Sequence, residues 1–148
     1  MLPRIHMGLA VRDLDASLAF YTSLLRVEPT KVRPGYAKLE GIEPSINLTL
    51  NQTDTLPARH ATEHFGIEVG STEQVVEAHG RMKAAGYATL SEEGVTCCFA
   101  VQDKVWIIDP DGYRWEVFVR HADAEVHSIP NEAADDEGCC ADVASACC

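Results

Sequence analysis

The sequence predicts an α+β protein made of two βαβββ modules in tandem. The first observation is an internal repeat, because HMGLAV at 6–11 and HFGIEV at 64–69 both read His-x-Gly-aliphatic-x-Val. The second is the order of elements behind each copy, where a helical pattern is followed by three strand-like segments. We therefore expect the modules to form a curved mixed sheet around a metal-binding cleft.

Apolar spacing and turn residues support each element in order. The first helix has apolar residues at helical spacing (Leu14, Leu18, Tyr21 and Leu25), and the second opens with a Ser71–Gln74 capping box and ends at Gly86. The expected strands are residues 28–32, 36–40 and 46–51 in the first half, and 87–91, 96–108 and 113–120 in the second. We expect an interruption of 96–108 near Gln102–Asp103, and the Asp-Pro-Asp-Gly turn at 109–112 precedes the last strand.

Length and charge bound the function. A chain of 148 residues is the size of one domain, and its net charge of −11 excludes general affinity for nucleic acid or anionic membranes. No apolar run is long enough to span a membrane, and the N-terminus lacks a signal-peptide pattern, so we expect a cytoplasmic protein.

Charge is unevenly distributed along the chain. Seven of the 23 acidic residues, but none of the 12 basic ones, follow residue 120. We expect a domain at 1–120, with modules at about 1–55 and 60–120, and an acidic, disordered tail at 121–148.

The six cysteines occur as three adjacent pairs. The tail holds two of them, Cys139–Cys140 and Cys147–Cys148. Neighbouring cysteines form a disulfide with each other only under backbone strain, so the tail pairs indicate capture of a soft metal ion in a reducing compartment.

Strand alternation selects three candidate metal ligands. His6, His64 and Glu116 each lie on the face of their strand opposite its apolar residues. Two imidazoles and one carboxylate suit Fe(II), with positions left open for substrate and O₂. The matching strand of the first half offers only the poor ligands Asn47, Thr49 and Asn51, which favours an open catalytic site. The alternative is that all three candidates are ordinary polar strand residues.

The remaining pair, Cys97–Cys98, lies within the second module. Successive strand residues point to opposite faces, so joint binding requires a bulge or loop, which Gly94 permits. Two thiolates there suit As(III), Cd(II), Zn(II) or Hg(II), whereas one buried cysteine alone is more often inert packing.

The tandem plan with His6, His64 and Glu116 resembles the vicinal oxygen chelate superfamily over about residues 4–120. The stretch GVTCCFAVQDKVW followed by DPDGYRWEVF resembles its branch of organoarsenical carbon–arsenic lyases and cadmium-induced proteins. The resemblance implies an Fe(II)-dependent, O₂-using lyase that degrades trivalent organoarsenicals, such as methylarsonous acid, to arsenite. His6, His64 and Glu116 would be its metal ligands, with His6 replacing a residue that can be Gln in that family, and Cys97 and Cys98 would hold the arsenic.

Other functions stay open from the sequence. Lys104 is a candidate substrate-binding group. A non-enzymatic protein that sequesters or delivers cadmium or arsenic is the alternative on this fold, and catechol cleavage or glyoxalase-type isomerisation would leave the cysteine pair without a role. The organic group on arsenic, the oligomeric state and the role of the tail are not determined.

Overall fold

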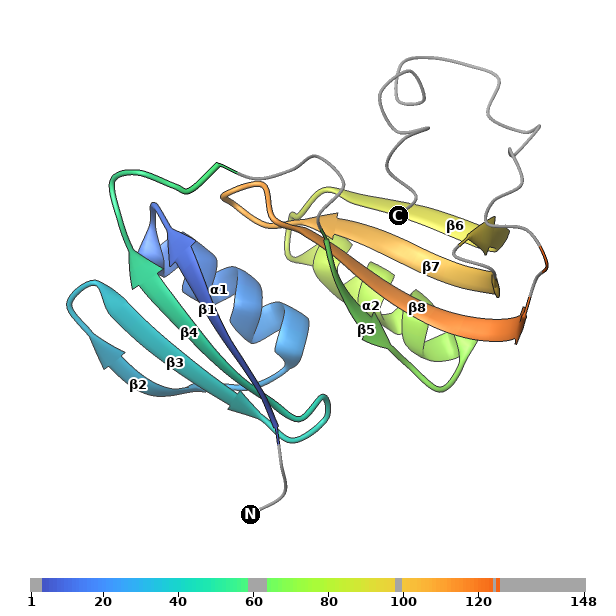
Figure 1. Ribbon diagram of the computed structural model, residues 1–148, viewed down its shortest axis with the longest axis horizontal. Helices are drawn as coiled ribbons and strands as arrows, with labels where there is room; N and C mark the ends of the chain where they lie inside the picture. The colour runs from blue at the N-terminus through green and yellow to red at the C-terminus, as the bar shows by residue number, and fades with distance from the viewer. Residues whose placement is uncertain (1–3, 59–63, 98–99, 124, 126–148) are drawn as a thin grey trace. The chain divides into compact units, whose positions relative to one another are not determined.

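The computed structural model describes residues 4–58, 64–97, 100–123 and 125, which form two modules of the same element order (Figure 1). The first contains β1 (Ile5–Val11), α1 (Leu14–Leu25), β2 (Pro29–Arg33), β3 (Tyr36–Gly41) and β4 (Ile46–Gln52). The second contains β5 (Phe65–Glu68), α2 (Thr72–Ala84), β6 (Thr89–Cys97), β7 (Ala100–Ile108) and β8 (Arg114–Asp123). The predicted tandem βαβββ plan is confirmed.

Each module forms its own four-stranded mixed sheet, in the order β1-β4-β3-β2 and β5-β8-β7-β6. The first and last strands of each module pair in parallel, and β2–β3, β3–β4 and β6–β7 pair antiparallel. The chain divides into two compact units, and the first unit also includes residues 81–88 and 108–113.

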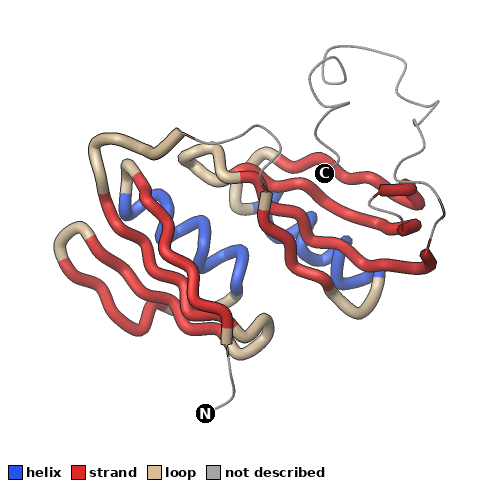
Figure 2. The backbone as a smooth tube through the Cα atoms, in the orientation of Figure 1, coloured by secondary structure: helices blue, strands red, loops and turns tan. Residues whose placement is uncertain are grey.

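In the first unit, α1 covers one face of the sheet (Figure 2). Asp13 caps the helix, since its Oδ1 accepts a hydrogen bond from the Ala16 amide at 3.0 Å. The core beneath it is aliphatic and aromatic, and includes Leu9, Val11, Phe20, Tyr21, Leu39, Leu48 and Leu50. Leu9 and Val11 alternate with His6, Gly8 and Ala10 along β1, which therefore stand on the face away from α1.

In the second unit, the same alternation organises β8. Trp115, Val117 and Val119 are buried in the core, and Arg114, Glu116 and Phe118 stand on the other face. The last turn of α2 and the residues after it (81–88) belong to the first unit, where the Arg81 guanidinium donates to the Ser23 carbonyl at 3.0 Å.

The predicted strand at 96–108 is wrong in its limits. β6 ends at Cys97 and β7 begins at Ala100, whereas Gln102 and Asp103 lie inside β7. In the sequence, two adjacent polar residues suggest the end of a strand. In the structure, Gln102 is buried, and Asp103 accepts hydrogen bonds from the Thr72 hydroxyl and the Gly94 amide. The polarity of Asp103 therefore reflects hydrogen-bond partners on other segments rather than a loop.

β8 continues three residues past the expected domain boundary at 120 and ends at Asp123. His121 Nε2 lies 2.8 Å from Asp103 Oδ2, which anchors this end of the strand. The rest of the predicted tail, with Cys139, Cys140, Cys147 and Cys148, lies outside the described residues. In the part of the chain that the structure describes, no helix is long and apolar enough to cross a membrane.

Candidate functional site

Two of the predicted ligands lie together on the second sheet. Gly66 of β5 pairs in register with Glu116 of β8, and His64 directly precedes β5. His64 Nε2 lies 3.6 Å from Glu116 Oε1, and the side chains are 20% and 12% exposed. An imidazole nitrogen and a carboxylate oxygen at this separation can share one cation.

Lys104 of β7 completes this group. Its Nζ lies 3.4 Å from Glu116 Oε2, and only 1% of its side chain is exposed. The Lys104 ammonium compensates the negative charge of the largely buried Glu116 carboxylate. It contacts Oε2 of that carboxylate, whereas Oε1 faces His64. The contact that Lys104 makes here is with Glu116, so its predicted role as a substrate-binding group remains a prediction.

Trp106 was missed in the sequence, although it alternates with Gln102 and Lys104 along β7. Its ring meets the His64 ring edge-on at 5.2 Å between centroids, and the Arg114 guanidinium lies over it at 4.8 Å. Its Nε1 donates to Glu92 Oε2 at 3.1 Å. Trp106 is therefore held by β6 and β8, and it supports the ring of His64 from the side.

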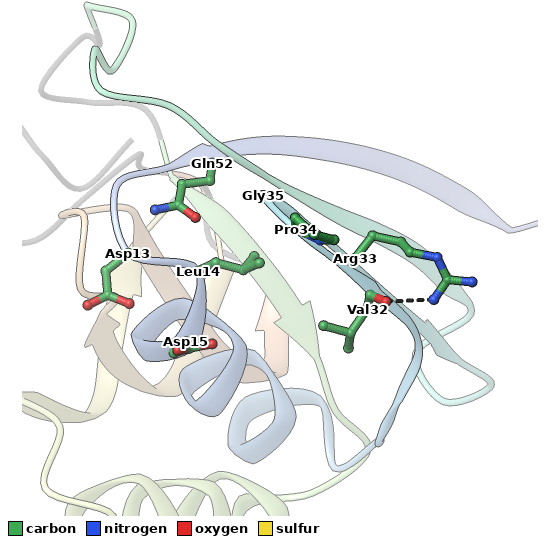
Figure 3. Close-up of a pocket in the computed structure, with 8 residues that line it drawn as sticks. All are labelled: Asp13, Leu14, Asp15, Val32, Arg33, Pro34, Gly35 and Gln52. Atoms are coloured by element: carbon green, nitrogen blue, oxygen red, sulfur yellow. Dashed lines mark hydrogen bonds between the residues drawn. The ribbon is translucent and has the colours of Figure 1, made fainter.

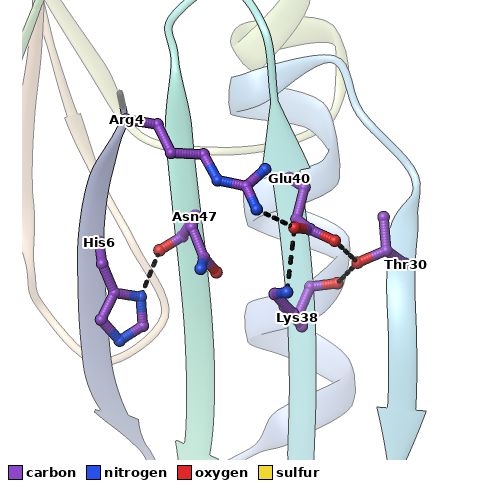
Figure 4. A network of polar contacts seen from close by, with 6 residues as sticks. All are labelled: Arg4, His6, Thr30, Lys38, Glu40 and Asn47. Atoms are coloured by element: carbon purple, nitrogen blue, oxygen red, sulfur yellow. Dashed lines mark hydrogen bonds and ion pairs between the residues drawn. The ribbon is translucent and has the colours of Figure 1, made fainter. Parts of the chain in front are cut away.

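The third predicted ligand, His6, lies on β1 in the first unit (Figure 4). Its Nδ1 is 2.9 Å from the main-chain oxygen of Asn47 on β4. A ring that donates its Nδ1–H to a carbonyl oxygen carries its free lone pair on Nε2. Metal-binding histidines are commonly oriented by such a bond, so the geometry fits ligation by Nε2.

A charged network lies on the same sheet as His6 (Figure 4). Lys38 Nζ is 2.9 Å from Glu40 Oε1, Thr30 Oγ1 donates to Glu40 Oε2 at 2.7 Å, and Arg4 also binds Glu40. These bonds, with that from Lys38 the strongest, lower the pKa of Glu40 to about 2. Glu40 is thus a carboxylate at every physiological pH, fully engaged by its neighbours.

The repeat shows why the predicted carboxylate ligand has no counterpart in the first module. Gly8 pairs with Thr49 in the first sheet, as Gly66 pairs with Glu116 in the second. Thr49 thus holds the register position that corresponds to Glu116, and its hydroxyl donates to the Met7 carbonyl at 3.4 Å. The first module therefore has a hydroxyl at this position, and that hydroxyl already makes a hydrogen bond within the sheet.

The structure brings some of the predicted site residues together and leaves others apart or undescribed. Within either unit, the described residues contain no group of three His, Cys, Asp or Glu side chains placed to hold one metal ion. His64 and Glu116 form a pair and His6 lies in the other unit, so the three-ligand site remains a prediction. Cys97 pairs in register with Ala100, and Cys98 lies outside the described residues.

A separate pocket of about 460 Å³ lies beside the start of α1 (Figure 3). It is lined by Asp13, Leu14, Asp15, Val32, Arg33, Pro34, Gly35 and Gln52. None of the predicted site residues is among them, so this pocket plays no part in the site at His64 and Glu116.

Comparison with known proteins shows the family of this chain. A model of the Glyoxalase/Bleomycin resistance protein/Dioxygenase superfamily matches residues 5–117. The chain belongs to this superfamily. Its fold is similar to a superfamily member from Alicyclobacillus acidocaldarius, with a TM-score of 0.64, 18% identity, and coverage of 80% of this chain and 91% of that one. The fosfomycin resistance protein FosX from Listeria monocytogenes has a TM-score of 0.62 at 20% identity, covering 80% and 93%.

Relatives with higher sequence identity carry two kinds of name. A protein from Thermomonospora curvata named trivalent organoarsenical cleaving enzyme is 42% identical over 94% of this chain and 89% of its own. One of the same name from Bacillus sp. is 44% identical, covering 83% and 76%. The cadmium-induced protein CadI of Mycobacterium tuberculosis is 41% identical, covering 99% and 93%.

Proposed function

We propose that this protein is an Fe(II)-dependent, O₂-using carbon–arsenic lyase that degrades trivalent organoarsenicals to arsenite and so confers resistance to them. The main observation in support is the His64–Glu116 pair on one face of the second sheet. Lys104 contacts the Glu116 carboxylate, and Trp106 packs edge-on against the His64 ring. Relatives at 42% and 44% identity that are named trivalent organoarsenical cleaving enzymes support the substrate class.

The donor set fits iron. His6 and His64 would supply imidazole nitrogens and Glu116 a carboxylate oxygen, the set suited to Fe(II) with positions left open. The bond between His6 Nδ1 and the Asn47 carbonyl leaves Nε2 for the metal, and Lys104 leaves Glu116 Oε1 beside His64. Iron, when bound, would supply O₂ activation, which side chains alone do not provide.

The cysteine pair would hold the substrate. Cys97 and Cys98 are candidates to bind trivalent arsenic as thiolates, since thiolate is the preferred ligand of soft ions. Holding arsenic beside the metal would lower the entropic cost of bringing the carbon–arsenic bond to the reactive centre. This role requires both cysteines to stay reduced, so we place the protein in the cytoplasm as part of the proposal.

Anaerobic reconstitution tests the proposal. Protein loaded with Fe(II) and methylarsonous acid should release arsenite after O₂ is admitted and not before. Glu116→Gln and His64→Ala should lose Fe(II) binding, whereas Cys97→Ser and Cys98→Ser should keep Fe(II) and lose turnover. Arsenite release no greater than in the metal-free control would contradict the enzyme assignment.

The second candidate is a protein that binds cadmium or arsenic without catalysis, which the name of the relative CadI favours. Truncation after Glu125 separates the two, because it keeps β8 and its His121–Asp103 contact but removes the four tail cysteines. A lyase should keep most of its arsenite release, whereas a sequestering protein should lose most of its Cd(II) capacity.

A further inference from the structure

The side chain of Asn47 stands directly opposite His6 on the first sheet. Asn47 of β4 pairs in register with His6 of β1 on one side and with Glu40 of β3 on the other. Leu48 and Leu50, which alternate with it along β4, are buried in the core. The Asn47 side chain therefore points to the other face of the sheet, which is also the face of His6 (Figure 4).

The carboxamide oxygen of Asn47 is buried, yet it accepts no hydrogen bond from any of the described residues. Three donors of the adjacent network all bind the Glu40 carboxylate instead: Arg4, Lys38 and Thr30. The Thr49 hydroxyl, two residues further along β4, donates to a main-chain carbonyl. His6 Nδ1 contacts the main-chain oxygen of Asn47, 2.9 Å away, and not its side chain. The sheet itself thus supplies no donor to Asn47 Oδ1.

A buried carbonyl oxygen without a donor destabilises a folded protein, because it has given up its hydrogen bonds to water. Such atoms are rare, and a functional role or a bound water or ion is a common reason for one. A leucine at position 47 would have the same branched shape and would avoid this cost. The asparagine is therefore unfavourable here unless a ligand places an O–H or N–H donor beside His6.

We propose that Asn47 is a positioning residue of the proposed metal site, and that its Oδ1 accepts a hydrogen bond from a water molecule bound to the metal beside His6. The inference rests on the proposed function for the metal and for the role of His6. Water on a cation is a strong donor, because the positive charge polarises its O–H bonds. Asn47 would then act twice on the site: its main-chain oxygen orients the imidazole, and its side-chain oxygen holds a water on the metal.

Anaerobic Fe(II) titration tests the proposal. The reference protein is the full chain with serine at the four tail cysteines, so that their thiols cannot bind the metal. Asn47→Leu removes the acceptor and should weaken Fe(II) binding about tenfold, the usual scale for loss of a group that supports a metal site. The metal-free variant should unfold at a higher urea concentration than the reference, because the unsatisfied oxygen is gone.

Asn47→Asp separates the acceptor from stability. It keeps an acceptor oxygen, so it should bind Fe(II) at least as tightly as the reference. Without metal it should be less stable than the reference, because its charge lies beside the Glu40 carboxylate. Fe(II) affinity should therefore follow the presence of the acceptor and not the stability of the metal-free protein.

Asn51→Leu is the matched control, because Asn51 lies on the same strand and face but is exposed. It should change neither the Fe(II) affinity nor the urea midpoint. Asn47→Ala removes the acceptor without adding bulk, and its Fe(II) affinity decides the matter if Asn47→Leu does not fold.

Two results would overturn the positioning role: unchanged Fe(II) affinity in the variants that lack the acceptor, or an equal loss of affinity in Asn47→Asp. A reference protein that binds no Fe(II) would contradict both this inference and the proposed function. A protein that shows the expected Fe(II) affinities but releases no arsenite from methylarsonous acid would contradict the proposed function and leave this inference intact.

Discussion

Lys104 Nζ lies 3.4 Å from Glu116 Oε2 although only 1% of the lysine side chain is exposed. A buried ammonium is costly unless a carboxylate compensates it, so the two residues depend on each other for burial. Glu116 is also the proposed carboxylate ligand. The proposed metal site and the stability of the second unit therefore share one side chain.

Lys104→Met should lower the free energy of unfolding of the metal-free protein by about 1–3 kcal/mol, because Glu116 loses its charged partner. Urea denaturation at neutral pH measures this. The same substitution in a Glu116→Gln background should cost less, since no carboxylate remains to be compensated. Equal losses in both backgrounds would show that Lys104 contributes only packing.

Gly66→Ala should weaken Fe(II) binding about tenfold, the usual scale for disturbing the support of a ligand. A Cβ on Gly66 would stand 3.2 Å from both Glu116 Oε1 and Phe118 Cε1, so the carboxylate must move. Anaerobic Fe(II) titration measures the change. Gly80→Ala is the matched control: its Cβ meets nothing within 4 Å in α2, so it should leave affinity unchanged and raise stability by about 0.5–1 kcal/mol. Equal affinity in the two variants would contradict the idea that Gly66 makes room for Glu116.

The module plan was predictable because its signals are local. The alternation of Leu9 and Val11 with His6 follows from strand geometry, and the repeat at His64 transfers the same plan to the second half. The face on which each candidate ligand stands therefore needed no knowledge of distant contacts. Contacts between residues on different strands could not be predicted in this way. The contact between Lys104 and Glu116, for example, depends on the register of two strands that the sequence alone cannot align.

The limits of β6 and β7 were missed for the same reason. The β6–β7 pairing shifts register between Glu92 and Val95, and at this point the Gly94 amide donates a hydrogen bond to Asp103 Oδ1, nine residues further along the chain. Without that contact, the changed alternation after Glu92 looks like the end of one strand, and the polar pair Gln102–Asp103 looks like a turn. Trp106 was missed because its partners His64, Glu92 and Arg114 lie on three other segments.

Tyr21→Phe should destabilise the first unit by about 1–3 kcal/mol, because a buried carboxylate oxygen loses its donor. The Tyr21 hydroxyl donates to Asp109 Oδ2 at 2.7 Å, and both residues are buried. Thermal or urea unfolding measures the loss. Tyr113→Phe is the comparison: its hydroxyl donates to the Ala10 carbonyl at 3.1 Å in a partly buried position, so it should cost less. A larger loss from Tyr113→Phe would contradict the importance of the charged acceptor.

Glu40→Gln should destabilise the protein at neutral pH by an amount that shrinks as the pH is lowered. Lys38, Thr30 and Arg4 lower the pKa of Glu40 from 4.5 to about 2. A carboxyl whose pKa is depressed on folding contributes stability above its unfolded pKa, and this is lost as pH falls through the folded value. The difference between wild type and variant should therefore be constant above about pH 5 and fall between pH 4.5 and 2, as followed by urea denaturation. A difference that does not depend on pH would show that the charge of Glu40 is not the stabilising element.

Asp109 should show the opposite dependence on pH. Burial raises its pKa above the ordinary 3.8, and the hydrogen bonds from Tyr21 and from the amides of Tyr113 and Asp111 offset this only in part. The folded state then binds a proton more readily than the unfolded state, so stability falls as pH rises from 3.8 through the folded pKa. Asp109→Asn removes the titration, and wild type should lose stability relative to this variant across that window in urea denaturation at successive pH values.

The Tyr21 hydroxyl supplies an internal check on that sign. Its bond favours the charged form of Asp109, so Tyr21→Phe should raise the Asp109 pKa further and move the window to higher pH. The carboxyl carbon shift of Asp109, followed by NMR in wild type and Tyr21→Phe, measures both values directly. A lower Asp109 pKa in Tyr21→Phe would mean that the hydroxyl does not donate to the carboxylate, and the buried contact between α1 and the turn at 109–112 would then have to rest on packing alone.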